Sequence, residues 1–582
     1  MSAIFLMAAG LGAFILGYLV YSKYISERVF RLDPGFRTPA HAQEDGIDFV
    51  PTNRFVLWGH HFTSVAGAAP IVGPAIAVVW GWLPAFLWVV LGTVFFAGVH
   101  DAGALWASVR NRGQSIGALT ESVVGKRARS LFMIVIFLLL LMVNAVFAIV
   151  IANLFVSFPS SVIPSWFVIV VALGIGYSLY RRGVPLFWPS AIGLVLLYAS
   201  MFVGDVIPVS LPGELLGLGV PAQWVLLLFA YAAIASLLPV WMLLQPRDYI
   251  NGLQLFTALG IFFVAVLLAN PGIVAPAINA ARPADVPPII PLLFVTIACG
   301  AISGFHGLVS SGTTSKQVDN ERDVRLIGFL GATGEGALAL AAIIACTAGF
   351  ASLGEWQAFY SSFAAGGTSA FVQGGGAIIT SGLGFPAHLG QTMLAVMAVL
   401  FAATTMDTGV RLQRYIIQEW GSIYEVPALT KRGLATLIAV GSCVALAFGA
   451  GGGAGTGGLI IWPLFGTTNQ LLAALTLLVL SVYLLKMKRP TVYTLVPFIF
   501  LIVMTILALL VQLRGFWERS QYFLVFVDIL ILVATIWVAL ESLGALRRAR
   551  TQGGSGGVAA PPGAGAGPGA GTGPGAATGT GR

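Results

Sequence analysis

Residues 49–101 read FVPTNRFVLWGHHFTSVAGAAPIVGPAIAVVWGWLPAFLWVVLGTVFFAGVHD. This stretch is apolar enough to enter a bilayer, yet it carries ionisable side chains and is repeatedly interrupted by glycine and proline. Ionisable groups and helix breakers are both costly at membrane depth unless they line a polar cavity. Their coincidence predicts a polar transport site inside a membrane-spanning region. The candidate residues in this stretch are His60, His61, Gly67, Pro70, His100 and Asp101.

The composition of the whole chain excludes the soluble classes. Of its 582 residues, 58% are hydrophobic and 9% are charged, which leaves too little polar side chain to cover a water-soluble surface. The formal net charge is +8, but the basic residues are scattered between apolar runs, so nucleic acid is not an expected partner. The loops are too short for a catalytic domain. We therefore expect a membrane protein that is not an enzyme and whose function lies within its helices.

Apolar runs of about 20 residues predict about fifteen transmembrane helices in an all-α polytopic fold. They lie near residues 3–22, 55–80, 84–107, 131–157, 165–180, 186–207, 221–243, 252–270, 290–312, 326–351, 389–410, 433–450, 457–485, 491–512 and 521–545. An external N-terminus puts every basic residue except Arg282, Arg514 and Arg519 on the cytoplasmic side, so the positive-inside rule favours this orientation in the plasma or inner membrane.

Two segments fall outside these helices. Residues 352–388 are rich in glycine and are expected to form an external or re-entrant loop. The transmembrane domain is expected to end near residue 545, and residues 546–582 to form a disordered cytoplasmic tail of Gly, Ala and Pro, since almost no large apolar side chain is available to bury.

The histidines of the opening stretch are predicted to lie in the inner half of the membrane. His60 and His61 follow the basic end of their helix by about six residues, or roughly 10 Å at a rise of 1.5 Å per residue. His100 and Asp101 lie at a similar depth in the next helix. Because histidine exchanges protons near neutral pH, these residues suit a proton relay or a site for a substrate carboxylate. The alternative is a structural hydrogen-bond network. Gly67 and Pro70 favour an unwound segment beside them.

A second group of polar residues lies in ACGAISGFHGLVSSGTTSK, residues 298–316. Here His306 is expected near the midplane, followed by Ser310, Ser311 and Thr313. Hydroxyl groups at this depth can coordinate Na⁺ or relay protons, but small hydroxyl residues also let helices pack closely. The sequence leaves both interpretations open.

Carboxylates complete the set of candidates. Glu335 is expected near the midplane, where an unpaired carboxylate is expensive, and it is either a titrating group or a neutral structural one. Asp407 and Arg411 are four residues apart and can pair on one helix face, either at the site or as an interfacial anchor. Arg247 and Asp248 are candidates for a gate at the cytoplasmic mouth.

At these motifs the sequence resembles the carbon starvation protein A (CstA) family, which includes bacterial peptide and pyruvate transporters. The resemblance covers about residues 1–545. It is carried by DGIDFVPTNRFVLWGHHF, GAAPIVGP, AGVHD, ASVRNRGQSIG, LPVWMLLQPRDY, CGAISGFHGLVSSGTTSK, TTMDTGVRLQRYIIQE and WPLFGTTNQLLAALTL.

This family is similar to the amino acid, polyamine and organocation superfamily, whose LeuT-like core is two inverted five-helix repeats. The resemblance implies a core at about residues 55–410, with broken first helices at 55–80 and 221–243. It also makes 290–312 the eighth core helix, so that Ser310, Ser311 and Thr313 would meet the unwound part of 55–80 in a cation site.

The function expected from these observations is secondary active import of small carboxylate nutrients, short peptides or pyruvate, in response to carbon starvation. No cofactor is expected. The expected coupling ion is H⁺, with Na⁺ as the alternative. The competing hypothesis is an intramembrane metal-binding protein or metal transporter that uses the histidines, although the sequence contains no HExxH helix.

Overall fold

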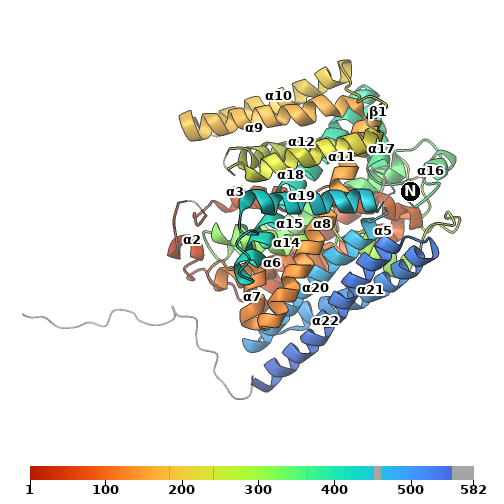
Figure 1. Cartoon of the computed structure of the whole chain (residues 1–582). Helices are drawn as coiled ribbons and strands as arrows, with labels where there is room; N and C mark the ends of the chain where they lie inside the picture. The colour runs from red at the N-terminus through yellow and green to blue at the C-terminus, as the bar shows by residue number, and fades with distance from the viewer. Residues whose placement is uncertain are drawn as a thin grey trace, which may run out of the picture.

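The computed structural model describes residues 1–552 except 47, 183, 186, 216, 240–241, 364 and 451–459. The described part is a bundle of long helices packed side by side (Figure 1). It contains thirteen helices long and apolar enough to cross a membrane, and one further pair of helices that passes the same test together but is bent. The predicted all-α polytopic fold is confirmed, while the exact number of spans stays a prediction.

The bounds of the elements follow the chain. The first half contains α1 (Ala3–Leu16), α2 (Pro39–Ala42), α3 (Arg54–Val65), α4 (Ala69–Ala77), α5 (Trp82–Gly92), α6 (Gly98–Arg110), α7 (Ile116–Val123), α8 (Lys126–Ser157), α9 (Val162–Arg182), α10 (Phe187–Val206), α11 (Val220–Leu237) and α12 (Leu244–Ala269). The second half contains α13 (Ile289–Thr296), α14 (Gly304–Gly312), α15 (Asp323–Ala348), α16 (Leu353–Phe359), α17 (Thr368–Leu383), α18 (Ala387–Ile423), α19 (Arg432–Gly449), α20 (Trp462–Lys486), α21 (Val492–Glu518) and α22 (Tyr522–Gln552). Strands β1 (Glu214–Leu215) and β2 (Leu218–Gly219) form a small antiparallel hairpin before α11.

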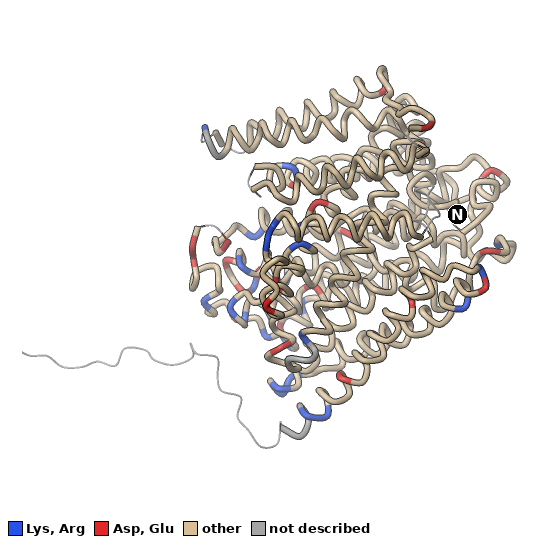
Figure 2. Tube along the Cα trace, in the orientation of Figure 1, with Lys and Arg blue, Asp and Glu red and all other residues tan. Residues whose placement is uncertain are grey.

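The basic side chains gather at one end of the bundle. Figure 2 shows most Lys and Arg residues at the end that carries α2 and the far end of α22, away from the N-terminus. This is the asymmetry on which the predicted orientation depends. The predicted tail at 546–582 begins as the last turns of α22, and its residues beyond 552 lie outside the described part of the chain.

The first helix break lies where the sequence predicts it. Helix α3 is capped by Asn53, whose side chain accepts a hydrogen bond from the Phe55 N–H (3.0 Å). The chain unwinds after Val65 and restarts at α4 with Pro70 in the first turn, where proline is tolerated. The two helical pieces, Arg54–Val65 and Ala69–Trp80, meet at 54°. The predicted unwound segment at Gly67 is therefore confirmed.

A second helix break lies within the predicted helix 290–312. The structure divides this helix into α13 and α14, with residues 297–303 between them and Gly300 at a φ of +94°. Only glycine adopts this conformation without strain, so Gly300 fixes the place of the break. The break that the resemblance implies within 221–243 stays a prediction, because α11 ends at Leu237, α12 begins at Leu244, and residues 240–241 between them lie outside the described part of the chain.

The two breaks pack against each other. A Cβ added at Gly73 would lie 3.4 Å from the Ile297 Cα, and one at Gly300 would lie 3.4 Å from the Pro70 Cα. The numbering rises along one segment as it falls along the other, so α4 and the interruption between α13 and α14 are antiparallel. Two interrupted helices therefore lie side by side in opposite directions, with their breaks in contact.

The glycine-rich stretch at 352–388 is not a simple loop, which corrects the prediction. It contains α16 and the largely buried helix α17, which packs against α12, α15 and α18. Its glycines allow this close packing, because a Cβ at Gly376 would lie 2.6 Å from the Gln391 side chain. The low hydropathy of these glycines is what hides the helix in the sequence.

Candidate functional site

A chain of four buried titratable side chains lies where α6, α14 and α15 meet. His100 Nδ1 is 2.7 Å from one Asp101 carboxylate oxygen, and His306 Nδ1 is 2.7 Å from the other. On the far side of its ring, His306 Nε2 lies 3.0 Å from a Glu335 carboxylate oxygen. An ionised carboxylate only accepts hydrogen bonds, so both Nδ1 atoms donate to Asp101. We call these four residues the histidine–carboxylate chain.

Close helix packing brings these residues together. Gly307, one residue after His306, would place a Cβ 3.2 Å from the His100 ring, so α14 approaches α6 closely at this point. The side chains of His100, Asp101 and His306 are fully buried, and that of Glu335 is 2% exposed. A charge at this depth is tolerated only with opposite charge and hydrogen bonds beside it, and the chain supplies both.

His61 extends this group from the broken helix. Its Nδ1 lies 2.9 Å from the Thr314 hydroxyl. A Cβ at Gly331 would lie 2.7 Å from His61 Cδ2, and Gly331 is one turn before Glu335 on the same face of α15. Helix α3 therefore reaches α15 beside Glu335 through His61, which lies four positions before Val65, the last residue of α3.

Several buried polar atoms around this chain have no hydrogen-bond partner among the described residues. They are His61 Nε2, His100 Nε2, His306 Nε2, Ser310 Oγ and Glu335 Oε1. His306 Nε2 lies at ion-pair distance from Glu335, but the two groups are not aligned for a hydrogen bond. Buried polar atoms are usually paired, and exceptions cluster where a protein moves protons or takes a ligand. The site therefore has unused capacity to bind or transfer protons.

The remaining predicted residues lie around the chain in different ways. His60 is half-buried, and the described side-chain hydrogen bonds do not join its ring to the histidine–carboxylate chain. Ser311 faces α7, because its hydroxyl accepts from the Ile116 N–H (2.9 Å), whereas Thr313 is exposed. Thr314, which directly follows Thr313 in the same hydroxyl-rich turn of the sequence, is the hydroxyl residue that reaches α3.

The unwound segment itself contacts α18 and α8. Its described contacts do not include the hydroxyl-bearing residues Ser310, Ser311 and Thr313. A Cβ at Gly67 would lie 2.8 Å from the Thr405 hydroxyl and 3.2 Å from the Phe147 ring. Pro70 packs beside Gly300. The described contacts do not join Ser310, Ser311 or Thr313 to this segment as the resemblance implies: Ser311 is bonded to α7, Thr313 is exposed, and Ser310 Oγ has no hydrogen-bond partner among the described residues.

A second buried group of charges surrounds Asp407 on α18. Asp407 is ion-paired with Arg247 of α12 and accepts a hydrogen bond from the Tyr231 hydroxyl of α11 (2.9 Å). The predicted partner, Arg411, instead donates to the carbonyls of Ala235 (2.9 Å) and Leu238 (2.8 Å). Arginine satisfies the free carbonyls at the end of α11, which explains why the local pairing is not formed.

The bundle end below the site is held together by an ion pair between α6 and the loop before α15. Arg110 binds both carboxylate oxygens of Glu321, and the Asp33 N–H donates to the same carboxylate (2.6 Å). Burial raises the pKa of Glu321 above its ordinary value of 4.5, although Arg110 and the Asp33 N–H favour its charged form. His41 lies beside Asp319 in the same region, at 2.8 Å.

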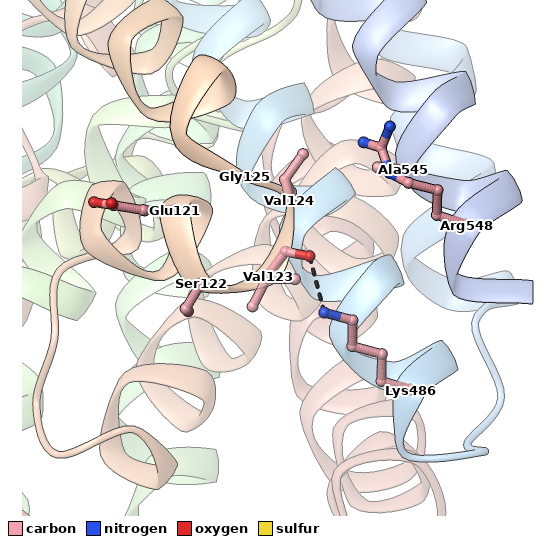
Figure 3. Close-up of a pocket in the computed structure, with 8 residues that line it drawn as sticks. All are labelled: Glu121, Ser122, Val123, Val124, Gly125, Lys486, Ala545 and Arg548. Carbon is pink, nitrogen blue, oxygen red and sulfur yellow. Dashed lines mark hydrogen bonds between the residues drawn. The ribbon is translucent and has the colours of Figure 1, made fainter. Parts of the chain in front are cut away.

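A surface cavity of about 210 Å³ lies elsewhere, between the α7–α8 junction, α20 and α22 (Figure 3). Lys486 crosses it and donates to the Val123 carbonyl (3.0 Å). None of the candidate residues lines this cavity. Across the described residues, no group of three or more His, Cys, Asp or Glu side chains is arranged to hold a metal ion.

Antiparallel broken helices beside buried, partly unpaired titratable groups define a multi-pass membrane transport protein. The comparisons with known proteins narrow this class. The family model for "Carbon starvation protein CstA" matches residues 2–358 and 350–508. The chain belongs to the carbon starvation protein CstA family, as the sequence motifs predict, and is a transporter of that family.

Curated relatives match over most of their length. The chain is 33% identical to the peptide transporter CstA of Campylobacter jejuni, over 87% of this chain and 79% of that protein. It is 32% identical to the pyruvate/proton symporter BtsT of Escherichia coli, over 90% and 84%. It is 30% identical to the peptide transporter CstA of Bacillus subtilis, over 90% and 92%.

Solved structures are more distant. A manganese transporter of Eremococcus coleocola gives a TM-score of 0.46 at 13% identity, covering 87% of this chain and 99% of that one. The structure of MhsT in complex with L-phenylalanine gives a TM-score of 0.43 at 14% identity, covering 84% of this chain and 99% of that one.

Proposed function

We propose that this protein imports small carboxylate nutrients, short peptides or pyruvate, by secondary active transport coupled to protons. The observation that supports the proposal most directly is the histidine–carboxylate chain beside the helix breaks. The names of the relatives supply the two classes of cargo, and one of these relatives is a proton symporter.

The coupling proton is assigned to the contact between His306 and Glu335. Because His306 Nδ1 is hydrogen-bonded to Asp101, Nε2 is the ring atom that gains or loses a proton. It faces the Glu335 carboxylate at 3.0 Å, within reach for direct transfer. His100 holds the other oxygen of Asp101 and thereby fixes the carboxylate that orients the His306 ring.

Proton transfer at this contact would change how the broken helix packs. With His306 charged and both carboxylates ionised, α14 is attracted to α6 and to α15 at once. Loss of one positive charge leaves Asp101 and Glu335 without the cation between them, so the contact of α14 with its neighbours weakens. His61 of α3 lies at the same surface of α15, so the broken helix senses that change. This is a two-state element of the kind that alternating access requires.

The orientation of the chain is part of the proposal. We place the N-terminus outside and the C-terminal end in the cytoplasm of a cell whose plasma or inner membrane the bundle spans. The gathering of Lys and Arg at the end away from the N-terminus supports this orientation (Figure 2).

The test is uptake of labelled pyruvate and of a labelled dipeptide into proteoliposomes, with and without an inward proton gradient. Glu335→Gln keeps the shape of the side chain and removes its titration. We expect gradient-driven uptake by the unchanged protein, and in the variant the loss of gradient-driven uptake but not of exchange between internal and external cargo.

The matched control is Arg514→Gln, which alters an arginine of α21 whose side chain is 82% exposed and pairs only with its neighbour Glu518 among the described ion pairs. It should behave as the unchanged protein does. Uptake that ignores the proton gradient but follows a Na⁺ gradient would replace H⁺ by Na⁺ as the coupling ion. Absence of uptake for both cargoes would refute the proposed function.

A further inference from the structure

The second buried group of charges contains an arginine that is only partly engaged. Arg247 lies in the first turn of α12 and is 1% exposed. One terminal nitrogen, Nη1, is ion-paired with Asp407 and donates to the Tyr231 hydroxyl (2.7 Å). On another edge of the guanidinium group, Nε has no hydrogen-bond partner in the described part of the chain. The guanidinium is thus fixed on one side and has donor capacity left on the other.

The charges of this region do not balance. Its buried charged side chains are three arginines and two aspartates: Arg247, Arg411, Arg414, Asp248 and Asp407. Arg411 and Arg414 donate hydrogen bonds to the carbonyls of Ala235, Ser236 and Leu238. These carbonyls lie at the C-terminal end of α11, where the partial negative charge of the helix terminus compensates part of the positive charge of the two arginines. With both aspartates ionised, the formal charges of these five side chains sum to +1. One oxygen of each aspartate, Asp248 Oδ1 and Asp407 Oδ1, also has no hydrogen-bond partner among the described residues. An anionic ligand would restore neutrality, provided that it approaches Arg247 on the side away from these oxygens.

This region adjoins the break in the first broken helix. The Asn251 side chain of α12 donates to the Thr404 hydroxyl of α18 (2.7 Å), and Thr404 is three residues before Asp407. The next residue of α18, Thr405, is the one that Gly67 of the unwound segment approaches. On the same side, Gly252 of α12 packs against Thr63 of α3.

Helix α3 therefore lies between two buried polar centres. His61 turns toward α14 and α15, where the histidine–carboxylate chain lies. Thr63 and Gly67 turn toward α12 and α18, where Arg247 and Asp407 lie. One centre is rich in groups that exchange protons, and the other is rich in cations that do not.

We propose that Arg247 is the receptor for the carboxylate group of the cargo. The assignment rests on the proposed function and names the part of the ligand that is recognised. A planar guanidinium binds a carboxylate with two parallel hydrogen bonds, and the edge that contains Nε is the one that Asp407 and Tyr231 leave available. Asp407 and Tyr231 are positioning residues that hold Nη1. The carboxylate is the group that pyruvate and a short peptide share, so one receptor serves both.

The experiment measures binding, not transport, on the purified full-length protein. Tryptophan fluorescence or calorimetry gives the Kd for pyruvate and for a dipeptide, and for two neutral analogues, pyruvamide and the same dipeptide with a C-terminal amide. Arg247→Lys keeps the positive charge but lacks the planar pair of donors. We expect its Kd for both carboxylates to rise by roughly tenfold to a hundredfold, whereas the Kd for the amides changes by less than about twofold.

Two further variants keep the assignment testable. Tyr231→Phe removes one hydroxyl that holds Arg247, and its Kd for the carboxylates should rise by about threefold to tenfold with the amides unaffected. If Arg247→Lys does not fold, the Kd values of Tyr231→Phe decide whether Arg247 binds the carboxylate. The control Arg514→Gln should bind all four compounds as the unchanged protein does.

The outcomes separate the two proposals. Folded Arg247→Lys protein that binds both carboxylates as tightly as the unchanged protein overturns the assignment of Arg247 and leaves the proposed function standing. An equal loss of carboxylate and amide binding also overturns it, since this indicates a general structural effect. An unchanged protein that binds neither carboxylate refutes the proposed cargo, and the receptor assignment is refuted with it.

Discussion

Replacing Asp101 by asparagine should destabilise the folded protein far more than the same change at Asp528. Both aspartates are 0% exposed. Asp101 accepts hydrogen bonds from two histidines, whereas neither carboxylate oxygen of Asp528, on α22, has a hydrogen-bond partner among the described residues. The two substitutions are chemically identical, so they separate the value of the partners from the cost of burying a carboxylate.

The magnitude follows from the contacts. A hydrogen bond to a charged group contributes about 1.5–3 kcal/mol, so two such bonds contribute about 3–6 kcal/mol. The asparagine amide oxygen can accept one ordinary hydrogen bond, which restores about 1 kcal/mol. The net loss at position 101 is therefore about 2–5 kcal/mol. At position 528 the change replaces a buried carboxyl group that has no hydrogen-bond partner among the described residues, so it should leave stability unchanged or raise it.

The assay is reversible unfolding in mixed micelles of mild detergent and dodecyl sulfate, followed by tryptophan fluorescence. The free energy of unfolding is compared among the unchanged protein, Asp101→Asn and Asp528→Asn. A loss at position 528 equal to that at position 101 would show that burial of the carboxyl group, not its pairing with His100 and His306, sets the energy. A neutral effect of Asp101→Asn would refute the described hydrogen bonds.

Two further predictions concern the helix break and the ion pair at the bundle end. Gly67→Val places a side chain against Thr405 and Phe147, so uptake should be lost with an overpacking cost of about 1–3 kcal/mol, while Gly260→Ala, where nothing lies within 4 Å of the added Cβ, should transport normally. Transport by Gly67→Val at the normal rate would show that the close contact at the break is dispensable. Burial raises the pKa of Glu321 in the folded state above 4.5, so the folded protein binds its proton more tightly than the unfolded chain does. Its contribution to stability is therefore present below pH 4.5 and decreases as the pH rises through the folded-state pKa. Melting temperatures from pH 4 to 8 should show this slope in the unchanged protein and lose it in Glu321→Gln, and identical slopes would contradict the assignment.

Local features of the sequence predicted most of the fold. A bilayer forces each spanning segment to satisfy its backbone hydrogen bonds within a helix, so apolar runs reveal spans one at a time. The break at Gly67 could be predicted because Gly and Pro concentrate there. The break at 297–303 could not, since ACGAIS contains one glycine and no proline, and α17 was missed because its glycines lower its hydropathy.

The residue types at the site were also visible in the sequence, whereas their partners were not. The sequence predicts that His61, His100, Asp101, His306 and Glu335 lie at membrane depth, since each interrupts an apolar run. Only the tertiary structure decided that Asp101 joins two histidines, one of them 205 residues away, and that Asp407 pairs with Arg247, 160 residues away, rather than with its neighbour Arg411. The physical reason is that burial of a charge is fixed by local hydrophobicity, while its compensation depends on which helices pack together.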